Sequence, residues 1–336
     1  MSKYLNVFNT LAEYQAFSAS TEYVQPNVAL VKETNVLYYD YGDNKPQADL
    51  SDYKLEPEET SVGGDKYGNS AITKVNYIPS GITGLTNAFS NWSSLVNVPV
   101  IPNSVTDMHS TFKGCSSLVN APEIPSGVTS LYSTFYDCSS LVNAPEIPNS
   151  VTDMRCTFQG CSSLVTAPEM PSGVTSLYHT FDGCSSLVNA PKIPSGVTNI
   201  DSIFQGCTSL VNAPVIPSIR YIRYTFYGCS SLVNAPEIPS GVKSLDSTFY
   251  DCSSLVNAPE IPNSVTDMRC TFQGCSSLKE VTFLHTTPPT YKDTLKNCSS
   301  LESIYVPDSA VDAYKTATGW SAFAPKFKPL SEKPSE

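Results

Sequence analysis

Residues 138–148 read CSSLVNAPEIP, and this phrase returns along the chain with small changes, at intervals of 23 residues and once of 22. Each copy continues with a second phrase, such as NSVTDMRCTFQG at 149–160, which leads into the next cysteine. Nine cysteines mark successive copies: Cys115, Cys138, Cys161, Cys184, Cys207, Cys229, Cys252, Cys275 and Cys298. A fixed period of about 20 to 30 residues is typical of a solenoid, in which each repeat forms one turn and stacks on its neighbours.

The apolar positions of each copy explain why the turns must stack. In the copy that begins at Cys138, six side chains are expected to point inward: Leu141, Ala144, Ile147, Val151, Met154 and Phe158. Burying such a side chain stabilises by roughly 1.5–3 kcal/mol, whereas ordering the backbone costs roughly 1–2 kcal/mol per residue. One turn therefore cannot fold alone, and the sequence predicts a stack of about ten turns over residues 71–306.

Two stretches of each copy could carry a parallel β-ladder between turns. Proline cannot donate a ladder hydrogen bond, so we favour the stretch from Val128 to Ser133 and its equivalents over the proline-containing stretch. An asparagine column also supports stacking, because superposed amides can bond to each other and to turn carbonyls. Its members are Asn120, Asn143, Asn189, Asn212, Asn234 and Asn257, with Thr166 as an interruption.

The phrase VTDMRCTFQGCSSL at 151–164 resembles the BspA-like leucine-rich repeats of bacterial surface proteins. The final segment resembles the C-terminal cap of that family, with TTPPT at 286–290 and CSSLESIYVP at 298–307. A helix is expected from Ser309 to Thr318, with Asp308 as its cap and Gly319 at its end. The resemblance covers residues 71–330. It implies a leucine-rich-repeat solenoid with a role in adhesion or recognition at a cell surface, and it brings no catalytic residues. The longer, proline-interrupted phrase of this chain departs from the family's usual strand.

The segments outside the repeats differ in character. Residues 1–42 predict a small α/β module for docking or capping, with a helix from Asn9 or Thr10 to Phe17 and one or two strands between Val28 and Tyr41. Residues 43–70 are acidic and rich in turn-forming residues, which predicts a linker, and residues 307–336 form the cap and tail. The phrases FNTLAEYQAF at 8–17 and YVQPNVAL at 23–30 resemble the start of virion proteins of Bacteroidales-infecting (crAss-like) phages. The module would then dock the chain on a particle, or it simply caps the first turn.

Three positions per turn vary while their neighbours hardly change. Two of them follow the inward Leu or Met, and the third follows the Phe. Aromatic residues and arginine supply much of the binding energy of interfaces, so these positions predict a recognition surface. The predicted binding residues are Tyr132, Tyr136, Arg155, Tyr178, His179, Asp201, Arg220, Tyr221, Arg223, Tyr224, Tyr227, Asp246, Tyr250 and Arg269. Simple drift at exposed positions would give the same variation. A self-satisfied ladder of Asp201, Arg223, Asp246 and Arg269 is a further alternative, in which each exposed pair is worth roughly 0–1 kcal/mol.

The densest group of these residues falls at the 22-residue turn, where a glycine is lost and the chain reads IRYIRYTFY at 219–227. Tyr178, His179 and Asp201 extend this group in a form suited to a glycan or a protein loop. Alanine at Arg223 and Tyr227 is expected to weaken partner binding without lowering the melting temperature.

Composition and motifs argue against several other functions. The net charge of −11 and the lack of a Lys/Arg cluster weigh against nucleic acid. No run approaches the roughly 18 apolar residues of a membrane span, and the N-terminus lacks the apolar core of a secretion signal. His109, His179 and His285 lie on different turns without a paired nucleophile or acid. The sequence therefore predicts no enzyme and no cofactor.

The cysteine column is expected to hold reduced, buried thiols, because the column is uniform, the count of eleven is odd and cytosolic synthesis disfavours disulfides. Disulfides between turns about 5 Å apart are the alternative. Cys156 and Cys270 fall at a variable position and should be more accessible, and the spacing argues against zinc. A glutamate column is either a solvated edge or a calcium site: Glu123, Glu146, Glu169, Glu237 and Glu260.

Together these observations predict a non-enzymatic recognition or adhesion scaffold that binds a protein or a cell-surface glycan through its variable positions, as a component of a phage virion. A BspA-like adhesin on a bacterial surface or secreted from it is one alternative. A structural virion protein whose repeats contact sister subunits is another. The expected location is a virion or a cell surface.

Overall fold

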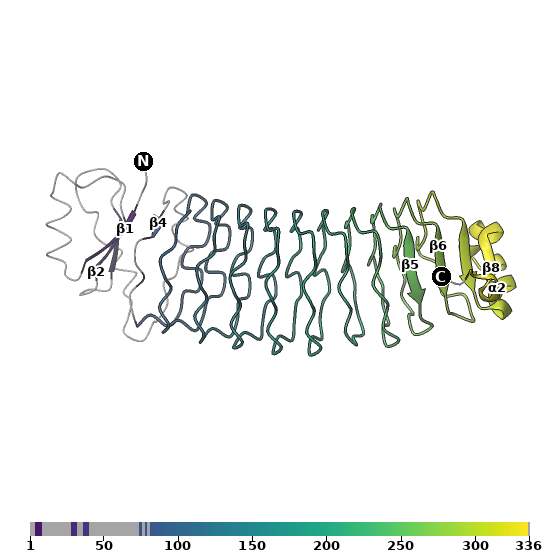
Figure 1. The fold of residues 1–336 in the computed structure, drawn as a ribbon, viewed down its shortest axis with the longest axis horizontal. Helices are drawn as coiled ribbons and strands as arrows, with labels where there is room; N and C mark the ends of the chain where they lie inside the picture. The colour runs from purple at the N-terminus through teal and green to yellow at the C-terminus, as the bar shows by residue number, and fades with distance from the viewer. Residues whose placement is uncertain are drawn as a thin grey trace. The chain divides into compact units, whose positions relative to one another are not determined.

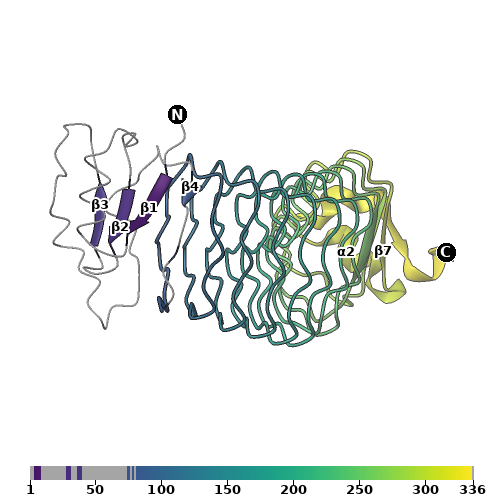
Figure 2. The same cartoon turned by 60° about the vertical axis from the view of Figure 1, so that its left-hand side comes forward.

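The computed structural model describes residues 4–8, 28–31, 36–39, 74–75, 78 and 81–334. The chain forms two compact units, Met1–Val151 and Thr152–Glu336. In each unit the repeats form turns that lie side by side (Figures 1 and 2). The predicted helix after Asn9 and the predicted linker over residues 43–70 lie outside the described residues.

A four-stranded sheet lies in the N-terminal part of the first unit. Its strands are β1 (Tyr4–Phe8), β2 (Val28–Val31), β3 (Val36–Tyr39) and β4 (Lys74–Val75), in the order β3-β2-β1-β4. β1 is parallel to β2 and to β4, and β2 is antiparallel to β3. Strands β2 and β3 fall within the interval predicted for strands. β4 joins this sheet to the segment that directly precedes the first turns.

The repeats form a solenoid, as the period predicts. In the copy used for the prediction, Leu141, Val151, Met154 and Phe158 are fully buried, whereas Ala144 and Ile147 are only half-buried. The set of residues predicted to point inward therefore wrongly included Ala144 and Ile147, because the Val-Asn-Ala-Pro-Glu stretch runs along the surface. The same columns of Leu, Phe and Cys are buried in the neighbouring turns of each unit.

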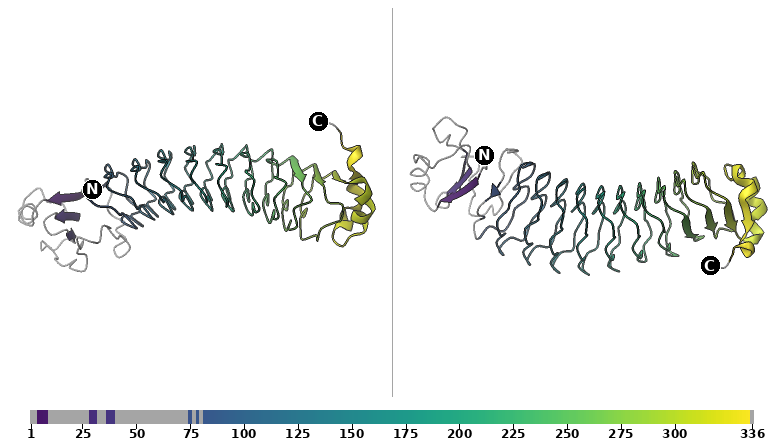
Figure 3. Two further views of the ribbon diagram at one scale, coloured as in Figure 1. Left: turned by 90° about the horizontal axis from the view of Figure 1, so that it is seen from below. Right: turned by 45° about the horizontal axis from the view of Figure 1, so that its top comes forward.

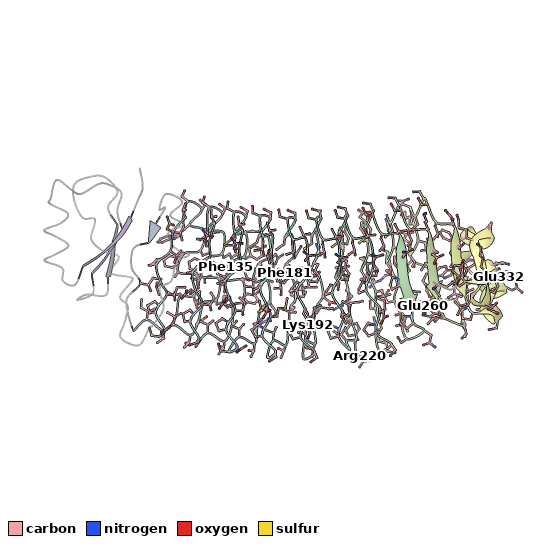
Figure 4. All side chains as sticks on the ribbon, in the orientation of Figure 1. Phe135, Phe181, Lys192, Arg220, Glu260 and Glu332 are labelled. Atoms are coloured by element: carbon pink, nitrogen blue, oxygen red, sulfur yellow. The ribbon has the colours of Figure 1, made fainter. Side chains whose placement is uncertain are left out.

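Phenylalanine rings form a stacked core within each unit. Phe112 and Phe135 stack with ring centroids 5.6 Å apart in the first unit, and Phe226 stacks between Phe204 and Phe249 at 5.8 and 5.6 Å in the second. Figure 4 labels Phe135 and Phe181, one ring from each unit. Because each ring contacts the ring of the next turn, the core is continuous along each stack.

Buried threonine and cysteine side chains also join the turns. Thr248 Oγ1 donates to the carbonyl of Ile222 at 2.9 Å, and Cys252 Sγ donates to the carbonyl of Phe226 at 3.1 Å. Equivalent bonds recur in both units, for example from Thr134. Buried polar groups need such partners, so these bonds explain how polar side chains occupy the interior. The threonine column was missing from the predicted core.

Single parallel bridges join neighbouring turns through both candidate stretches. Those of the second unit are Asp153 to Ser176, Ser176 to Asn199, Tyr221 to Ser244, Ser244 to Asp267, Thr166 to Asn189, Asn189 to Asn212, Asn212 to Asn234 and Asn234 to Asn257. The first unit shows the same arrangement, with Asp107 paired to Ser130 and Asn120 to Asn143. The asparagine column is therefore stacked through its backbone, and its side chains are exposed.

Longer strands form only in the last turns, through the stretch that the prediction rejected. These strands are β5 (Asn257–Ile261), β6 (Glu280–Phe283) and β7 (Ser303–Val306). The favoured stretch, from Val128 to Ser133, and its copies form single parallel bridges instead of a longer ladder, and the Val128 N–H bonds to Pro125 within its own turn. β6 and β7 lack proline and pair residue by residue, whereas the register of β5 shifts at its proline-containing centre.

The C-terminal cap covers the end of the second unit's stack (Figure 3). Strand β8 (Phe327–Pro329) completes the parallel sheet β5-β6-β7-β8. The cap also contains α2 (Val311–Thr316) and the 3-10 helices η2 (Asp308–Ala310), η3 (Trp320–Lys326) and η4 (Leu330–Glu332). Trp320 is fully buried, and its ring contacts Phe283, Tyr291, Tyr314 and Phe327.

The predicted cap helix is shorter than expected at both ends. A 3-10 turn occupies its predicted start, so Asp308 does not cap it, and Asp308 Oδ1 instead accepts a hydrogen bond from the Ser331 N–H at 3.1 Å. Gly319 lies beyond the helix end and precedes η3 with φ 79°. A Cβ atom there would approach Tyr291 to 2.8 Å, so glycine is required by space as well as by conformation.

Burial of His285 is expected to make the stability pH dependent. Its Nε2 lies 2.7 Å from the carbonyl of Val265, and within the described residues its buried Nδ1 has no hydrogen-bond partner. Burial lowers the pKa of His285 below its ordinary value. Below about pH 6.5 the unfolded chain therefore gains a proton that the folded chain does not. The free energy of unfolding should fall on acidification, with a slope of at most about 1.4 kcal/mol per pH unit.

Denaturant titrations of the wild type and of His285→Gln, at about pH 7.5 and about pH 5.5, measure this effect. Glutamine can still donate to Val265 but does not titrate. The wild type should lose more stability on acidification than the variant does. An equal loss in the two proteins would show that His285 does not carry the effect.

Candidate functional site

The variable positions lie on a tight segment of each turn, between the inward Leu or Met and the cysteine. This segment contains two residues in the left-handed region, four residues apart. The earlier of the two, which we call the first left-handed position, is the second variable position of each turn. It is occupied by Asn87, Ser110, Ser133, Cys156, His179, Ser202, Tyr224, Ser247, Cys270 and Asp293. The other is glycine, asparagine or aspartate, the residues that tolerate this conformation best. The sequence signal for both bends was the Gly, Asp or Asn directly before each of the nine column cysteines and the small residues that dominate the first left-handed position.

Backbone hydrogen bonds hold these segments in register from turn to turn. In the second unit the N–H groups of Tyr224, Phe226 and Gly228 donate to carbonyls of the next turn at 3.0, 2.9 and 2.7 Å. The same three bonds recur in other turns of both units. Because these bonds fix the bends, equivalent positions of successive turns become neighbours on one face. We call the surface formed by the three variable positions of each turn the bend face.

In the first unit the predicted residues Tyr132 and Tyr136 lie on this face. The Tyr132 ring contacts the His109 ring with centroids 4.6 Å apart, and the Lys113 ammonium lies 5.0 Å from the centre of the Tyr136 ring. Both tyrosines are half-buried. The described side chains therefore form two separate aromatic contacts there.

In the second unit the bend face contains a shallow, open depression of about 550 Å³. Three successive turns line it, through Tyr178, His179, Asp201, Ser202, Gln205, Arg223, Tyr224 and Tyr227. Six of these are predicted binding residues, which the structure brings together as expected. Ser202 and Gln205 were not among them, although both hold variable positions on the turn of Asp201.

The aspartates of this face form ion pairs, the alternative that the sequence offered for Asp201, Arg223, Asp246 and Arg269. Asp201 is only 6% exposed. Its carboxylate accepts bonds from Arg223 Nε at 2.9 Å, from Arg223 Nη2 at 2.5 Å and from the Arg223 backbone N–H at 2.9 Å. Hydrogen bonding to Asp201 also raises the pKa of Arg223. Asp201 therefore positions Arg223 rather than facing a partner.

A second pair repeats this arrangement. Arg269 Nη2 bonds to Asp246 at 2.9 Å and to Asp267 at 3.0 Å, and Asp246 is buried. Arg155 bonds to Asp153 of its own turn at 2.7 Å. The charge pairs considered from the sequence are thus present.

These pairs change the expected result at Arg223. Alanine there would leave the buried Asp201 carboxylate without its partner, a costly change. We therefore expect the melting temperature of that variant to fall, contrary to the expectation from the sequence.

Aromatic rings cover much of the depression and continue beyond it. The Tyr178 ring meets His179 edge to face, with centroids 4.1 Å apart. Tyr227 stacks on Tyr250 at 4.6 Å with an interplanar angle of 1°. Burial raises the pKa of Tyr227, so its hydroxyl stays protonated near neutral pH.

Six predicted residues of the second unit lie outside the lining of the depression: Arg155, Arg220, Tyr221, Asp246, Tyr250 and Arg269. Tyr221 lies next to it, with its ring centre 5.3 Å from the Arg223 guanidinium. Tyr250 and Arg269 belong to later turns. Arg220 lies at the lower edge of the turns in Figure 4. The 22-residue turn therefore contributes fewer residues to the depression than its sequence suggested.

All eleven cysteines carry free thiols, and each lies within the described residues. Burial raises the pKa of Cys115 and Cys298 to about 12 and that of Cys184, Cys207 and Cys229 well above the ordinary value. The column thiols are therefore protonated donors to backbone carbonyls. Cys156 and Cys270 are half-buried, as their variable position predicted.

Two further observations concern metals and membranes. Across residues 81–334 and the other described segments, no cluster of three or more His, Cys, Asp or Glu side chains could hold a metal ion. Glu260 of the glutamate column instead pairs with Lys333 at 3.1 Å. None of the helices in the described part of the chain is long and apolar enough to span a bilayer.

Comparison with known proteins identifies the repeat. The family model of the BspA type leucine-rich repeat region matches six copies, at residues 47–165, 133–255 and 201–318. None of the curated proteins matches the chain.

Several solved structures resemble this one. A leucine-rich repeat protein from Bacteroides ovatus is 21% identical, with a TM-score of 0.46, and the match covers 80% of this chain and 87% of that one. A leucine-rich cell surface protein from Faecalibacterium prausnitzii is 23% identical, with a TM-score of 0.42 and coverage of 77% and 80%. The leucine-rich repeat protein of T. pallidum is 27% identical, with a TM-score of 0.41 and coverage of 45% and 72%.

Proposed function

Because the chain belongs to the BspA-type leucine-rich repeat family, a family of scaffolds for protein interaction and adhesion, we propose that its bend face recognises a protein or glycan on another surface. The depression of the second unit is the centre of this contact. Its neighbours Tyr221, Tyr250 and Arg269 form the rim.

One observation carries this proposal. The first left-handed position holds a small residue in eight of the ten described turns, but it holds His179 and Tyr224 in two turns that line the depression. A non-glycine residue in this conformation costs roughly 1–2 kcal/mol, and asparagine, aspartate and histidine tolerate it better than a bulky residue does. Tyr224, at φ 56°, is therefore a costly choice for stability alone. Such strain is typical of functional positions.

The test uses Tyr224→Ser, because serine occupies the same position at Ser202 and Ser247. This variant removes the ring and keeps a side chain that the bend already accepts. The full chain is immobilised and exposed to intact cells and envelope preparations of gut Bacteroidales. We expect the wild type to bind and Tyr224→Ser to bind at least about tenfold more weakly, with no loss of thermal stability.

Val215→Ser is the matched control, since Val215 is 86% exposed and lies in the glutamate column rather than on the bend face. This variant should bind as the wild type does. Equal binding by Tyr224→Ser and the wild type, or no binding to any preparation of a broad panel, would refute the proposed function.

The setting that we propose for this face is a phage particle, with residues 1–42 as the docking module. The resemblance of residues 8–17 and 23–30 to phage virion proteins supports this setting, and a bacterial surface or secreted adhesin is the competing one. Particles purified from an infected culture should contain the protein, and deletion of residues 1–42 should remove it from them. Circular dichroism of the deletion variant checks that the repeats still fold. If the intact protein does not co-purify with particles, the phage setting is wrong.

A further inference from the structure

The depression also indicates the class of ligand. We infer that it binds a neutral, hydroxyl-rich glycan, an inference that rests on the proposed function and makes it more specific. The argument uses the charge balance, the hydrogen-bonding groups and the form of the depression.

The two basic side chains of the depression are already paired. Arg223 gives two side-chain hydrogen bonds to Asp201, and His179 Nδ1 lies 2.8 Å from Asp182 Oδ2. Arg223 and Asp201 cancel each other's charge, so the depression has little net attraction for an anionic ligand. A cationic ligand would compete with Arg223 for the same carboxylate. The pairing therefore favours a ligand without net charge.

The groups that remain suit hydroxyl groups. Arg223 keeps N–H groups that Asp201 does not use, since guanidinium has five donors. Gln205 offers an amide that both donates and accepts, and Tyr227 offers a protonated hydroxyl. A sugar hydroxyl both donates and accepts, so it can satisfy such mixed partners. A carboxylate can only accept hydrogen bonds, and an apolar group can neither donate nor accept them.

The aromatic rings supply the second element of sugar recognition. Tyr178 and Tyr224 are 39% and 38% exposed, so both keep accessible ring surface. A pyranose ring presents an apolar C–H face and a polar rim, and the C–H face packs against aromatic rings. Arg223 and Gln205, which would contact the polar edge of the sugar, lie in the same depression.

The form of the depression separates a glycan from a protein partner. A protein anchor residue binds best in an enclosed, fully desolvated pocket, whereas this depression is shallow and open and is lined by polar and aromatic groups from three successive turns. Sugar rings can lie flat across such a surface, with one turn of the solenoid beneath each part of the glycan. The geometry therefore favours an extended oligosaccharide over a peptide side chain.

Affinity electrophoresis of the full chain tests this inference. The probes are neutral mannan, xyloglucan and amylopectin, with polygalacturonate and heparin as charged comparisons and fibronectin as a protein comparison. At least one neutral glycan should retard the wild type. Tyr178→Ala and Tyr224→Ser should each weaken that binding about tenfold. Because no net charge is involved, binding should be nearly equal at low and high salt.

Val215→Ser is again the control, since Val215 is exposed and lies off the bend face, and it should bind as the wild type does. Envelope preparations that bind the wild type are treated in parallel with periodate, which cleaves vicinal diols, or with protease. Loss of binding after periodate supports the glycan. Binding that resists periodate but is lost after protease, or that depends strongly on salt, overturns the glycan inference and leaves the proposed function in place. No binding before either treatment overturns the proposed function itself.

Discussion

Phe226→Ala is expected to lower the free energy of unfolding by about 3–5 kcal/mol. Phe226 is fully buried and stacks against Phe204 and Phe249. Alanine would remove both ring contacts and leave a cavity between adjacent turns. Because each turn of a solenoid is stabilised mainly by its neighbours, the damage should divide the stack, so that the turns on either side unfold separately. Denaturant titration and amide hydrogen exchange measure the two effects.

Val215→Ala is the control for this experiment, because the exposed Val215 side chain contributes little packing. Its free energy of unfolding should stay within about 0.5 kcal/mol of the wild type. A Phe226→Ala protein that unfolds in a single transition, with a loss below about 1 kcal/mol, would contradict the continuous aromatic core.

Trp320→Ala is expected to have an effect of similar size, about 3–5 kcal/mol, at the C-terminal end. The Trp320 ring is fully buried, and its Nε1 donates to the carbonyl of Pro289 at 2.6 Å. Its loss would loosen η3 and β8, which cover the edge of β7. An uncovered strand edge pairs with other chains, so light scattering should detect aggregation at temperatures where the wild type stays monodisperse.

Trp320→Phe separates the packing contribution from the hydrogen bond. Phenylalanine keeps most of the ring contacts and loses the N–H donor, so its stability should lie between those of the wild type and Trp320→Ala. If Trp320→Ala keeps both the melting temperature and the solubility of the wild type, the cap does not protect the stack.

The sequence predicted the solenoid and most of its core, because a fixed period places the same side chain at the same point of every turn. The Leu, Phe and Cys columns needed only that rule. The Thr248 column was missed because a polar residue suggests a surface position. Its near invariance, in a chain whose exposed positions vary, was the available signal.

The length of the ladder strands and the burial of the charges could not be predicted in the same way. Val128 to Ser133 contains no proline and its copies form single bridges, but Val128 uses its N–H within its own turn, and no composition rule reveals that competition. Asp201 occupies a variable, nominally exposed position, and only the coordinates place it beneath Arg223. The six residues that do meet in the depression were predictable, because neighbouring turns bring equivalent positions together.

The free thiols of the cysteine column have one further consequence. Each is protonated and donates to a backbone carbonyl, and no pair forms a covalent cross-link, so folding within each unit requires no oxidant and no reductant. A protein built this way can be synthesised where glutathione keeps thiols reduced and can then act in an oxidising medium without exchanging a single bond.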